Sequence, residues 1–260
     1  MYLDKTGIKR SFSAASTTYD KVSALQRTVG LELLDSIDIS QLTGTVLDLG
    51  CGTGFLTGEL LAHATHETII ALDIALSMLQ TTKNKLTEHR NVLYVCADAE
   101  RLPFAEHSIA DVFSNLALQW CNDLDAVFTG IKRALKPEGL LVFSTFGPQT
   151  LQELKSAWAT VDDYHHVNTF YSETQLQQFL QHAGFNNCRL ESRLYSSRYD
   201  TVWSLMQELK QLGAHHVMAG RNNKITTKAA MQQMIAEYEK HRVAGQIPAT
   251  FEVITVIAQA

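Results

Sequence analysis

The sequence predicts an α/β fold in which helices flank a mostly parallel sheet. Between residues 45 and 146, short apolar runs alternate with amphipathic stretches, which is the pattern of parallel strands joined by right-handed helical crossovers. A glycine-rich loop at 50–54 follows the first apolar run, where such a fold turns from strand to helix. The chain has 260 residues, 45% hydrophobic and 19% charged, so one large domain can bury its core without disulfides.

Five strands and three helices are expected in this central part. Each strand is a short apolar run, and each helix is a longer amphipathic stretch. The third helix ends where Pro137 and Gly139 stop it. The expected strands are 45–49, 68–74, 92–96, 110–116 and 140–146, and the expected helices are 54–64, 75–88 and 124–136.

The two flanks depart from this alternation. Residues 1–44 are expected to form a helical segment that closes the ligand site, and 45–200 to form the core. A helical cap at 201–248 is expected between the late strands, over one end of the sheet, with the final strand of the core within 249–260. The later helices are expected at 149–162, 172–183, 202–218 and 226–244, and the later strands at 188–200 and 251–258.

Composition excludes several classes of function. The formal net charge of −5 disfavours nucleic-acid binding, which usually needs a basic surface. The sequence has no run of about 18 apolar residues and no apolar leader, so we expect a cytoplasmic protein with no membrane segment. Its four cysteines, Cys51, Cys96, Cys121 and Cys188, show no metal-ligand spacing, so no metal site and no disulfide framework are expected.

The glycine loop Asp48-Leu49-Gly50-Cys51-Gly52-Thr53-Gly54 is the strongest functional signal. Its place at the carboxyl end of a strand is where open α/β sheets bind ligands. A dinucleotide fingerprint reads G-x-G-x-x-G, but here the spacing is G-x-G-x-G, and Phe55 stands where the third glycine would be. The Asp48 carboxylate would repel a pyrophosphate but attract a cationic group, such as the ammonium of S-adenosylmethionine.

Polar residues also stand at the ends of the next three strands. Asp73 can accept hydrogen bonds from two ribose hydroxyls, although a helix cap or a solvated loop acid is the alternative. Asp98, followed by Ala99, could meet an adenine amino group, and Asn115, followed by Leu116, lies beside the expected methyl position. Parallel strands bring their carboxyl ends to one edge of the sheet, so these groups are expected around one ligand.

These motifs together resemble those of the class I S-adenosylmethionine methyltransferases, over about residues 40–146. The resemblance implies a Rossmann-like, seven-stranded sheet whose last strand runs antiparallel. It also implies S-adenosylmethionine as cofactor and S-adenosylhomocysteine as product. The cofactor-binding residues that it implies are Asp48, Gly50, Cys51, Gly52, Gly54, Asp73, Ile74, Met78, Asp98, Ala99, Asn115 and Leu116.

Several stretches outside this core resemble the malonyl-[acyl-carrier protein] O-methyltransferases of biotin synthesis. They are 12–20, 114–121, 143–154, 209–221 and 248–253, of which Leu209-Lys210-Gln211-Leu212-Gly213-Ala214-His215-His216 with Gly220-Arg221 is the most telling. Phe251 stands where many relatives have Tyr. The resemblance implies methylation of the free carboxylate of a malonyl thioester on acyl carrier protein.

That reaction needs no general acid or base, because a carboxylate with a pKa of about 4 is already ionised at neutral pH. Catalysis would then consist of positioning and exclusion of water. We expect no acid–base pair, and name as positioning residues Tyr19, Asn115, Gln119 and Trp120. Tyr19 could also be a core aromatic, and Trp120 could be simple packing.

The substrate carboxylate would need a counter-charge, which an arginine fork is best shaped to provide. Arg198 and Arg221 are favoured for this role, and Lys210, His215 and His216 lie in or near the same cap. Acyl carrier protein is acidic, so a docking patch is expected among Lys210, Arg221, Lys224 and Lys228.

Three other readings stay open on sequence grounds. The first is a class I methyltransferase for another small acid or ring compound. The second is a nicotinamide oxidoreductase, against which Asp48 and Phe55 argue. The third is a cofactor-binding protein without catalysis, such as a regulator or scaffold. The oligomeric state is not indicated by the sequence.

Overall fold

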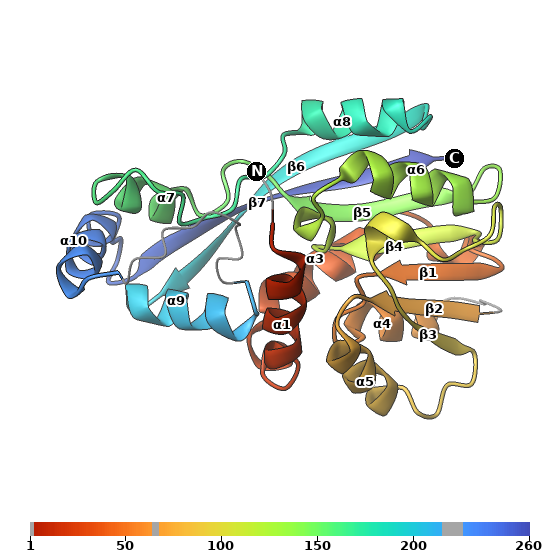
Figure 1. The fold of residues 1–260 in the computed structure, drawn as a ribbon, viewed down its shortest axis with the longest axis horizontal. Coiled ribbons are helices and arrows are strands. Elements are labelled where there is room, and N and C mark those ends of the chain that lie inside the picture. Colours follow the sequence, from red (N-terminus) through yellow and green to blue (C-terminus); the bar gives the residue numbers. More distant parts are fainter. Residues whose placement is uncertain (1–2, 64–67, 215–225) are drawn as a thin grey trace.

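A computed structural model describes residues 3–63, 68–214 and 226–260. In these ranges the strands form one seven-stranded sheet in the order β3-β2-β1-β4-β5-β7-β6 (Figure 1). The pairs among β1 to β5 are parallel, whereas β7 runs antiparallel to both β5 and β6. The strands are β1 (Thr45–Leu49), β2 (Thr68–Asp73), β3 (Val92–Cys96), β4 (Asp111–Asn115), β5 (Leu140–Phe146), β6 (Asn187–Tyr199) and β7 (Ile247–Gln259).

Successive residues of the central strands supply two separate cores, because side chains alternate between the faces of a sheet. On one face, Leu47 and Phe143 pack with α6 (Leu124–Ala134) and α8 (Glu173–His182). On the other, Val46 and Val142 pack with α3 (Ala24–Asp35) and α4 (Phe55–His63). A strand covered on both faces must be apolar throughout, which explains why these strands read as continuous apolar runs.

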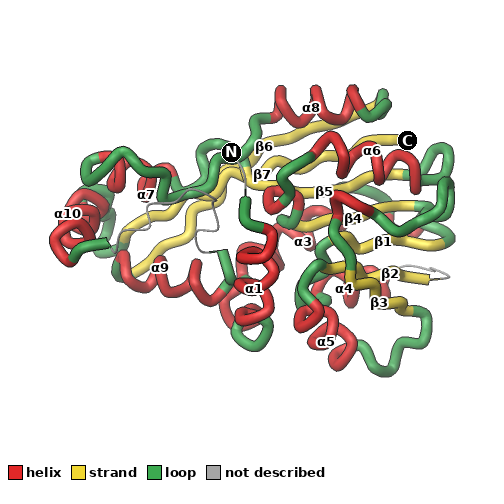
Figure 2. The backbone as a smooth tube through the Cα atoms, in the orientation of Figure 1, coloured by secondary structure: helices red, strands yellow, loops and turns green. Residues whose placement is uncertain are grey.

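A third core lies at the far end of β6 and β7, which continue beyond the last pairing of β7 with β5 at Phe146↔Val253. Figure 2 shows α7 (Gln152–Ala159), α9 (Val202–Gln211) and α10 (Lys228–Glu239) gathered around this overhang. Its buried side chains include Trp158, Leu205, Met234 and Tyr238. The overhang is therefore a small packed unit of its own at one end of the sheet.

The N-terminal segment crosses the edge of the sheet where the parallel strands end. It contains α1 (Lys5–Ala15), α2 (Tyr19–Val22) and, after α3, the short 3-10 helix η1 (Ile39–Gln41). Helix α1 packs against α5 (Leu76–Lys85). The Thr18 hydroxyl donates to the Gln211 carbonyl at the end of α9, 3.1 Å away. The segment thus touches both the parallel part of the sheet and the overhang.

The expected architecture is confirmed, and the differences concern element ends. The last strand begins at Ile247 rather than 251, because β6 pairs with it as far as Tyr199↔Ile247. The helix expected at 149–162 is shorter, since Leu151 adopts a left-handed conformation before α7. Helix α9 ends at Gln211, short of the expected 218, and residues 215–218 lie outside the described ranges. Within the described residues, no helix combines the length and apolarity needed to cross a membrane.

Candidate functional site

The loop from β1 to α4 is shaped by glycines in left-handed conformations. Gly50 has a φ of 78°, and a Cβ added to it would lie 2.3 Å from the Cβ of Ala117, so no side chain fits there. Gly52 has a φ of 55°, yet an added Cβ would meet no atom within 4 Å. The loop is therefore packed tightly at Gly50 and faces open space at Gly52, as expected where backbone must approach a ligand.

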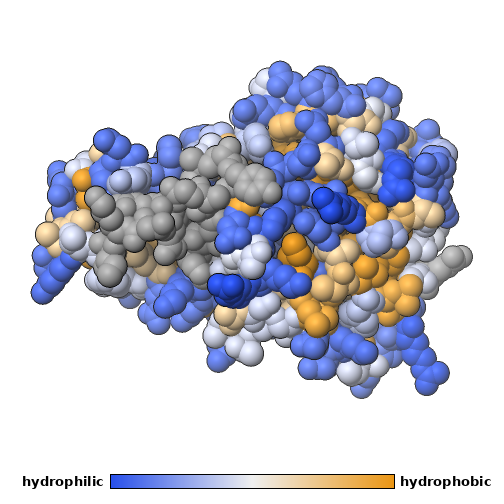
Figure 3. Space-filling model, viewed as in Figure 1, coloured by the Kyte–Doolittle hydropathy of each residue, from blue (hydrophilic) through white to orange (hydrophobic). Residues whose placement is uncertain are grey.

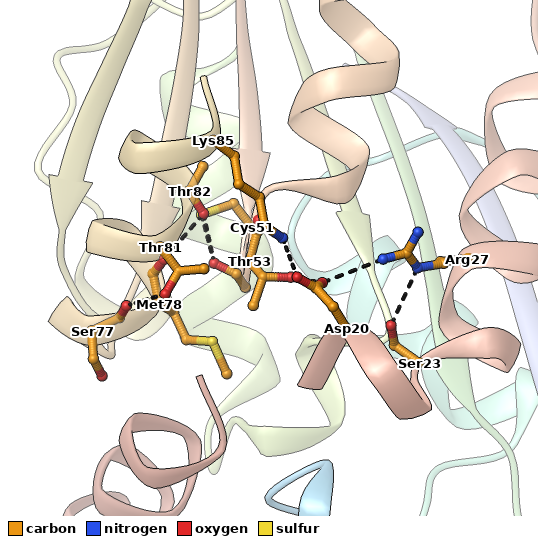
Figure 4. Close-up of polar contacts among 11 residues, drawn as sticks. Asp20, Ser23, Arg27, Cys51, Thr53, Ser77, Met78, Thr81, Thr82 and Lys85 are labelled. Atoms are coloured by element: carbon orange, nitrogen blue, oxygen red, sulfur yellow. Dashed lines mark hydrogen bonds and ion pairs between the residues drawn. The ribbon is translucent and has the colours of Figure 1, made fainter. Parts of the chain in front are cut away.

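Hydrogen bonds from two helices hold this loop in place (Figure 4). The Thr82 hydroxyl of α5 donates to the Gly52 carbonyl, 2.8 Å away. Asp20 of α2 accepts from the Thr53 hydroxyl at 2.7 Å and from Lys85. Burial alone would raise the pKa of Asp20, but the hydrogen bonds from Lys85 and Thr53 outweigh it and lower that pKa. The N-terminal segment is thus tied directly to the glycine loop.

Two buried carboxyl groups flank the loop. The Asp48 side chain is 1% exposed and accepts from the Thr57 hydroxyl at 2.5 Å, and burial raises its pKa to about 7. The oxygens of Asp73 accept from the backbone N–H groups of Gly52 at 3.0 Å and Ala75 at 2.8 Å. Burial raises the pKa of Asp73 to about 6 despite these bonds. Each Asp73 oxygen retains a lone pair for a further donor.

The principal hollow, of about 720 Å³ and partly open to solvent, lies at the carboxyl ends of β1, β2 and β4. Its walls carry an acidic group at Asp73 and apolar surface from Leu72 and Met78. Apolar side chains gather beside α1 on the face shown in Figure 3. The sequence-predicted cofactor residues that line this hollow are Gly50, Gly52, Asp73, Ile74, Met78, Asp98, Ala99, Asn115 and Leu116.

Three other predicted cofactor residues lie elsewhere. Asp48 and Cys51 line a smaller hollow of about 410 Å³, whose walls share Tyr19, Gly52 and Asn115 with the principal one. Gly54 lines neither hollow; an added Cβ would lie 2.5 Å from Cγ2 of Thr82, so its role is close packing on α5. In this structure the Asp48 side chain accepts from Thr57 of α4 and does not line the principal hollow.

Asp98 caps the 3-10 helix η2 (Ala99–Arg101) and also binds Lys5. The Lys5 ammonium lies 2.8 Å from carboxylate oxygens of both Asp98 and Glu100. Burial alone would lower the pKa of Lys5, but these two partners raise it. The N–H of Leu3 donates to Oδ1 of Asn122 at 2.6 Å. This bond anchors Leu3 to the segment that follows the 3-10 helix Leu118–Trp120.

The positioning residues from β4 onward are held by specific bonds. The amide of Asn115 donates to the Gln26 carbonyl and accepts from the Ser144 hydroxyl, each at 2.8 Å. Gln119 and Trp120 are neighbours on the 3-10 helix η3 (Leu118–Trp120) but face different spaces. Trp120 lines the principal hollow, whereas Gln119 lines an adjacent one. Tyr19 lines both hollows beside the glycine loop, and burial there raises its pKa well above its usual range.

The expected substrate cations that fall within the described residues are not gathered around the principal hollow. Arg198 is exposed on the edge strand β6, and Lys210 and Lys228 are exposed on α9 and α10; none of the three lines the hollows at the parallel strand ends. His215, His216, Arg221 and Lys224 lie outside the described residues.

Sequence reasoning expected residues 1–44 to close the site but named none of the α1 residues that line it. Lys5, Ile8 and Phe12 line the principal hollow, together with Ala117 and Leu118 from η3 and its approach. Their spacing indicates one face of a helix, because residues 5, 8 and 12 recur at the interval that places side chains on the same side. Without the neighbouring strands, that stripe cannot be told from ordinary core packing.

The residues of the principal hollow fit S-adenosylmethionine. The open space at Gly52 leaves room for a ligand against the loop, and the acceptor oxygens of Asp73 suit a ribose. Ile74, Met78 and the adjacent Asp98 combine apolar and polar surface suited to a purine.

Comparisons with known proteins agree with this geometry. Residues 47–143 match the family described as "Methyltransferase domain". The chain is 42% identical to a malonyl-[acyl-carrier protein] O-methyltransferase of Methylovorus sp. (strain MP688), over 97% of this chain and 88% of that protein. It is 40% identical to the protein of the same name from Gallionella capsiferriformans (strain ES-2), over 97% and 89%.

A solved structure shares the fold at much lower sequence similarity. Haemonchus contortus phosphoethanolamine N-methyltransferase 2, in complex with S-adenosyl-L-methionine, superposes with a TM-score of 0.59 and 16% identity, over 95% of this chain and 57% of that one. At this identity the likeness concerns the fold alone.

Proposed function

The chain belongs to the malonyl-[acyl-carrier protein] O-methyltransferase family of S-adenosylmethionine-dependent methyltransferases, and from this premise we propose that it methylates the free carboxylate of a malonyl thioester carried by acyl carrier protein. The observation that carries the proposal is the identity of 42% over 97% of the chain, which extends far beyond the cofactor-binding part. The product, a malonyl methyl ester, would serve biotin synthesis.

Several residues of the principal hollow would hold the cofactor. Asp73 would accept from the ribose, Asp98 and Ala99 would face the adenine, and the backbone at Gly50 and Gly52 would approach the amino-acid part. When bound, S-adenosylmethionine supplies an electrophilic methyl group on a sulfonium. Residues 1–44 would close the site, because Ile8, Phe12 and Tyr19 line the hollow from that segment.

The chain's own contribution to the reaction is positioning. A carboxylate oxygen of the substrate forms the bond to the methyl carbon, and the electron pair of the broken carbon–sulfur bond leaves with sulfur, so no proton has to move. Asn115 is held by Gln26 and Ser144, and Gln119 by Leu116 and Thr145, which makes these amides rigid walls rather than acid–base groups. Rigid orientation and exclusion of water then lower the barrier.

Methylation would change how the acyl chain is received by other enzymes. A free carboxylate at the end of an acyl chain is costly to bury in an apolar site. The ester removes that charge. The modified malonyl group could then enter enzymes that elongate ordinary apolar acyl chains, and the ester would be removed after elongation.

Incubation with S-adenosylmethionine and malonyl-acyl carrier protein, followed by intact mass analysis, tests the proposal. We expect the carrier to gain the mass of one methylene group. Acetyl-acyl carrier protein, which has no free carboxylate, is the matched control and should gain nothing. Methylation of free dicarboxylic acids in preference to the carrier-bound substrate would reject the proposal in favour of another small-acid methyltransferase.

A further inference from the structure

A second hollow, of about 800 Å³, lies beside the cofactor hollow at the carboxyl end of β5. The two are neighbours through the fold. Cys121 lines both, and Asn115 at the end of β4 pairs with Ser144 of β5, next to Thr145. Adjacent strands lie about 4.8 Å apart. A small group in the second hollow is therefore within reach of a group at the Asn115 end of the first.

Gln119 lines the second hollow in a fixed orientation. Its Nε2 donates to the Leu116 carbonyl at 2.6 Å, and its Oε1 accepts from the Thr145 hydroxyl at 3.2 Å. A primary amide has two N–H hydrogens. One is used by Leu116, which leaves the second for a ligand in the hollow that Gln119 lines.

Asn168 lines the second hollow from the segment between α7 and α8. Its Oδ1 atom is buried and has no hydrogen-bond partner among the described residues. A buried polar atom without a partner costs about 1–3 kcal/mol, so the amide of Asn168 calls for a partner such as a water molecule or a ligand group. Rotation of the amide by half a turn presents its N–H groups instead of its oxygen. The Tyr171 side chain lines the same hollow and carries a further hydroxyl donor.

The charge of this lining is informative. Among the described residues, the lining consists of apolar, aromatic, amide and hydroxyl side chains and includes no Lys, Arg, His, Asp or Glu. In transfer of a methyl group from a sulfonium to a carboxylate, both charges disappear together. A fixed cation beside the carboxylate would stabilise the starting state more than the transition state, whereas neutral donors orient the carboxylate with a smaller such penalty.

We propose that this hollow binds the malonyl carboxylate through the neutral donors of Gln119, Asn168 and Tyr171, and that no cation of the described chain neutralises it. The inference rests on the proposed function and deepens it. It assigns an uncharged pocket in place of the expected Arg198, with the donor's own positive charge as the counter-charge that attracts the substrate; Arg221 lies outside the described residues.

The test measures binding of malonyl-acyl carrier protein and of its methyl ester to the protein saturated with sinefungin, an unreactive analogue of S-adenosylmethionine that has a cationic amine where the sulfonium would be, at pH 8. Asn168→Asp keeps the side-chain shape and adds a negative charge. We expect it to weaken binding of the malonyl form about tenfold or more, because like charges repel in a partly desolvated site. Binding of the uncharged ester should change by less than about twofold. Asn187→Asp, on the exposed start of β6, is the matched control for added charge.

Asn168→Leu supplies an uncharged variant of similar size, and affinity for S-adenosylhomocysteine reports that each variant is folded. We expect Asn168→Leu to weaken the malonyl form more than the ester as well. Equal weakening of both forms, or no change in either, would overturn the uncharged pocket. Failure of the unaltered protein to methylate malonyl-acyl carrier protein would reject the proposed function itself, which separates the two failures.

Discussion

The parallel part of the sheet and the overhang of β6 and β7 use buried polar groups in opposite ways. In the parallel part, Asp73 accepts two backbone N–H groups and still presents lone pairs to a hollow. In the overhang, Glu153 accepts from both the N–H and the hydroxyl of Thr250, and Tyr238 donates to the Pro248 carbonyl at 2.9 Å. In the first arrangement, carboxylate lone pairs remain available to a ligand. In the second, the polar groups bond to one another and so join helices to strands.

This contrast separates the residues that can bind a ligand from those that stabilise the fold. Groups with remaining capacity stand at the ends of β1, β2 and β4, whereas the overhang is closed around an apolar core of α7, α9 and α10. Changes in the first region should therefore affect binding more than folding, and changes in the second should do the reverse. Four variants test that division, the first through ligand affinity and the other three through stability, in order of decreasing effect.

The largest effect on ligand affinity is expected at the glycine loop. Gly52→Ala adds a methyl group to open space at a φ of 55°, so the strain is about 1–2 kcal/mol but the ligand cradle is filled. Affinity for S-adenosylhomocysteine, measured by calorimetry, should fall about tenfold or more. Gly50→Ala is the matched contrast, because its methyl group would collide with Ala117 and lower the thermal midpoint before any ligand is added. Unaltered affinity in Gly52→Ala would show that the cradle lies elsewhere.

Leu205→Ala should affect folding while sparing the cofactor. Leu205 is 0% exposed in the overhang core, and its truncation should lower the free energy of unfolding by about 2–5 kcal/mol. On the same helix, Trp203 is 58% exposed, so Trp203→Ala should change that energy by less than about 0.5 kcal/mol. Denaturant titration measures both. A large loss of S-adenosylhomocysteine affinity in folded Leu205→Ala would break the division between the regions.

The pH dependence of stability should come from the parallel part. Native Asp48 holds its proton up to a pH of about 7, whereas an unfolded Asp loses it near a pH of about 4. The native state binds more protons in this window, so stability from this group falls as pH rises from about 4 to about 7. Asp48→Asn keeps an acceptor for Thr57 and should raise the free energy of unfolding at pH 8 by about 1–2 kcal/mol. The gain should vanish at pH 4; an equal gain at both pH values would contradict the assignment.

The smallest effect is expected where the regions touch. Thr18→Val removes the hydroxyl that donates to the Gln211 carbonyl, at a cost of about 0.5–1.5 kcal/mol. Thr17→Val, at an exposed neighbour, is the control. If the regions are energetically separate, the effects of Thr18→Val and Leu205→Ala on unfolding should add to within about 0.5 kcal/mol. A larger deviation would show that α9 and the N-terminal segment fold as one unit.

The sequence allowed the fold and the glycine loop to be predicted because both depend on local requirements. Apolar runs reveal strands buried on both faces, and the Asp48–Gly54 spacing distinguishes this loop from a dinucleotide fingerprint. Side-chain direction was harder. Gln119 and Trp120 are adjacent in sequence but line different hollows, because a 3-10 turn rotates successive residues by about a third of a circle.

The residues of the proposed carboxylate pocket were the least predictable part. An expected Arg clamp follows from pairing opposite charges, and Arg198 is a reasonable candidate in sequence. Its place on an exposed edge strand is decided by the pairing of β6 with β7, a contact across 50 residues (Arg198↔Pro248). Asn168 carried no sequence signal, because an amide in a connecting segment is usually solvated.

Asp98 belongs at once to the ligand hollow and to the attachment of the chain's first helix, since its Oδ1 accepts from Lys5 while the residue lines the cavity. Oδ1 also accepts from the N–H of Glu100, so any ligand group that bonds to Oδ1 would compete with Lys5 for that atom, and such competition is reciprocal. Under the proposed function, binding of the nucleoside through this atom would weaken the attachment of α1, and release of the spent nucleoside thioether would restore it. Ionic strength, which weakens the Lys5 pair, should act on the exchange rate of that thioether rather than on methyl transfer.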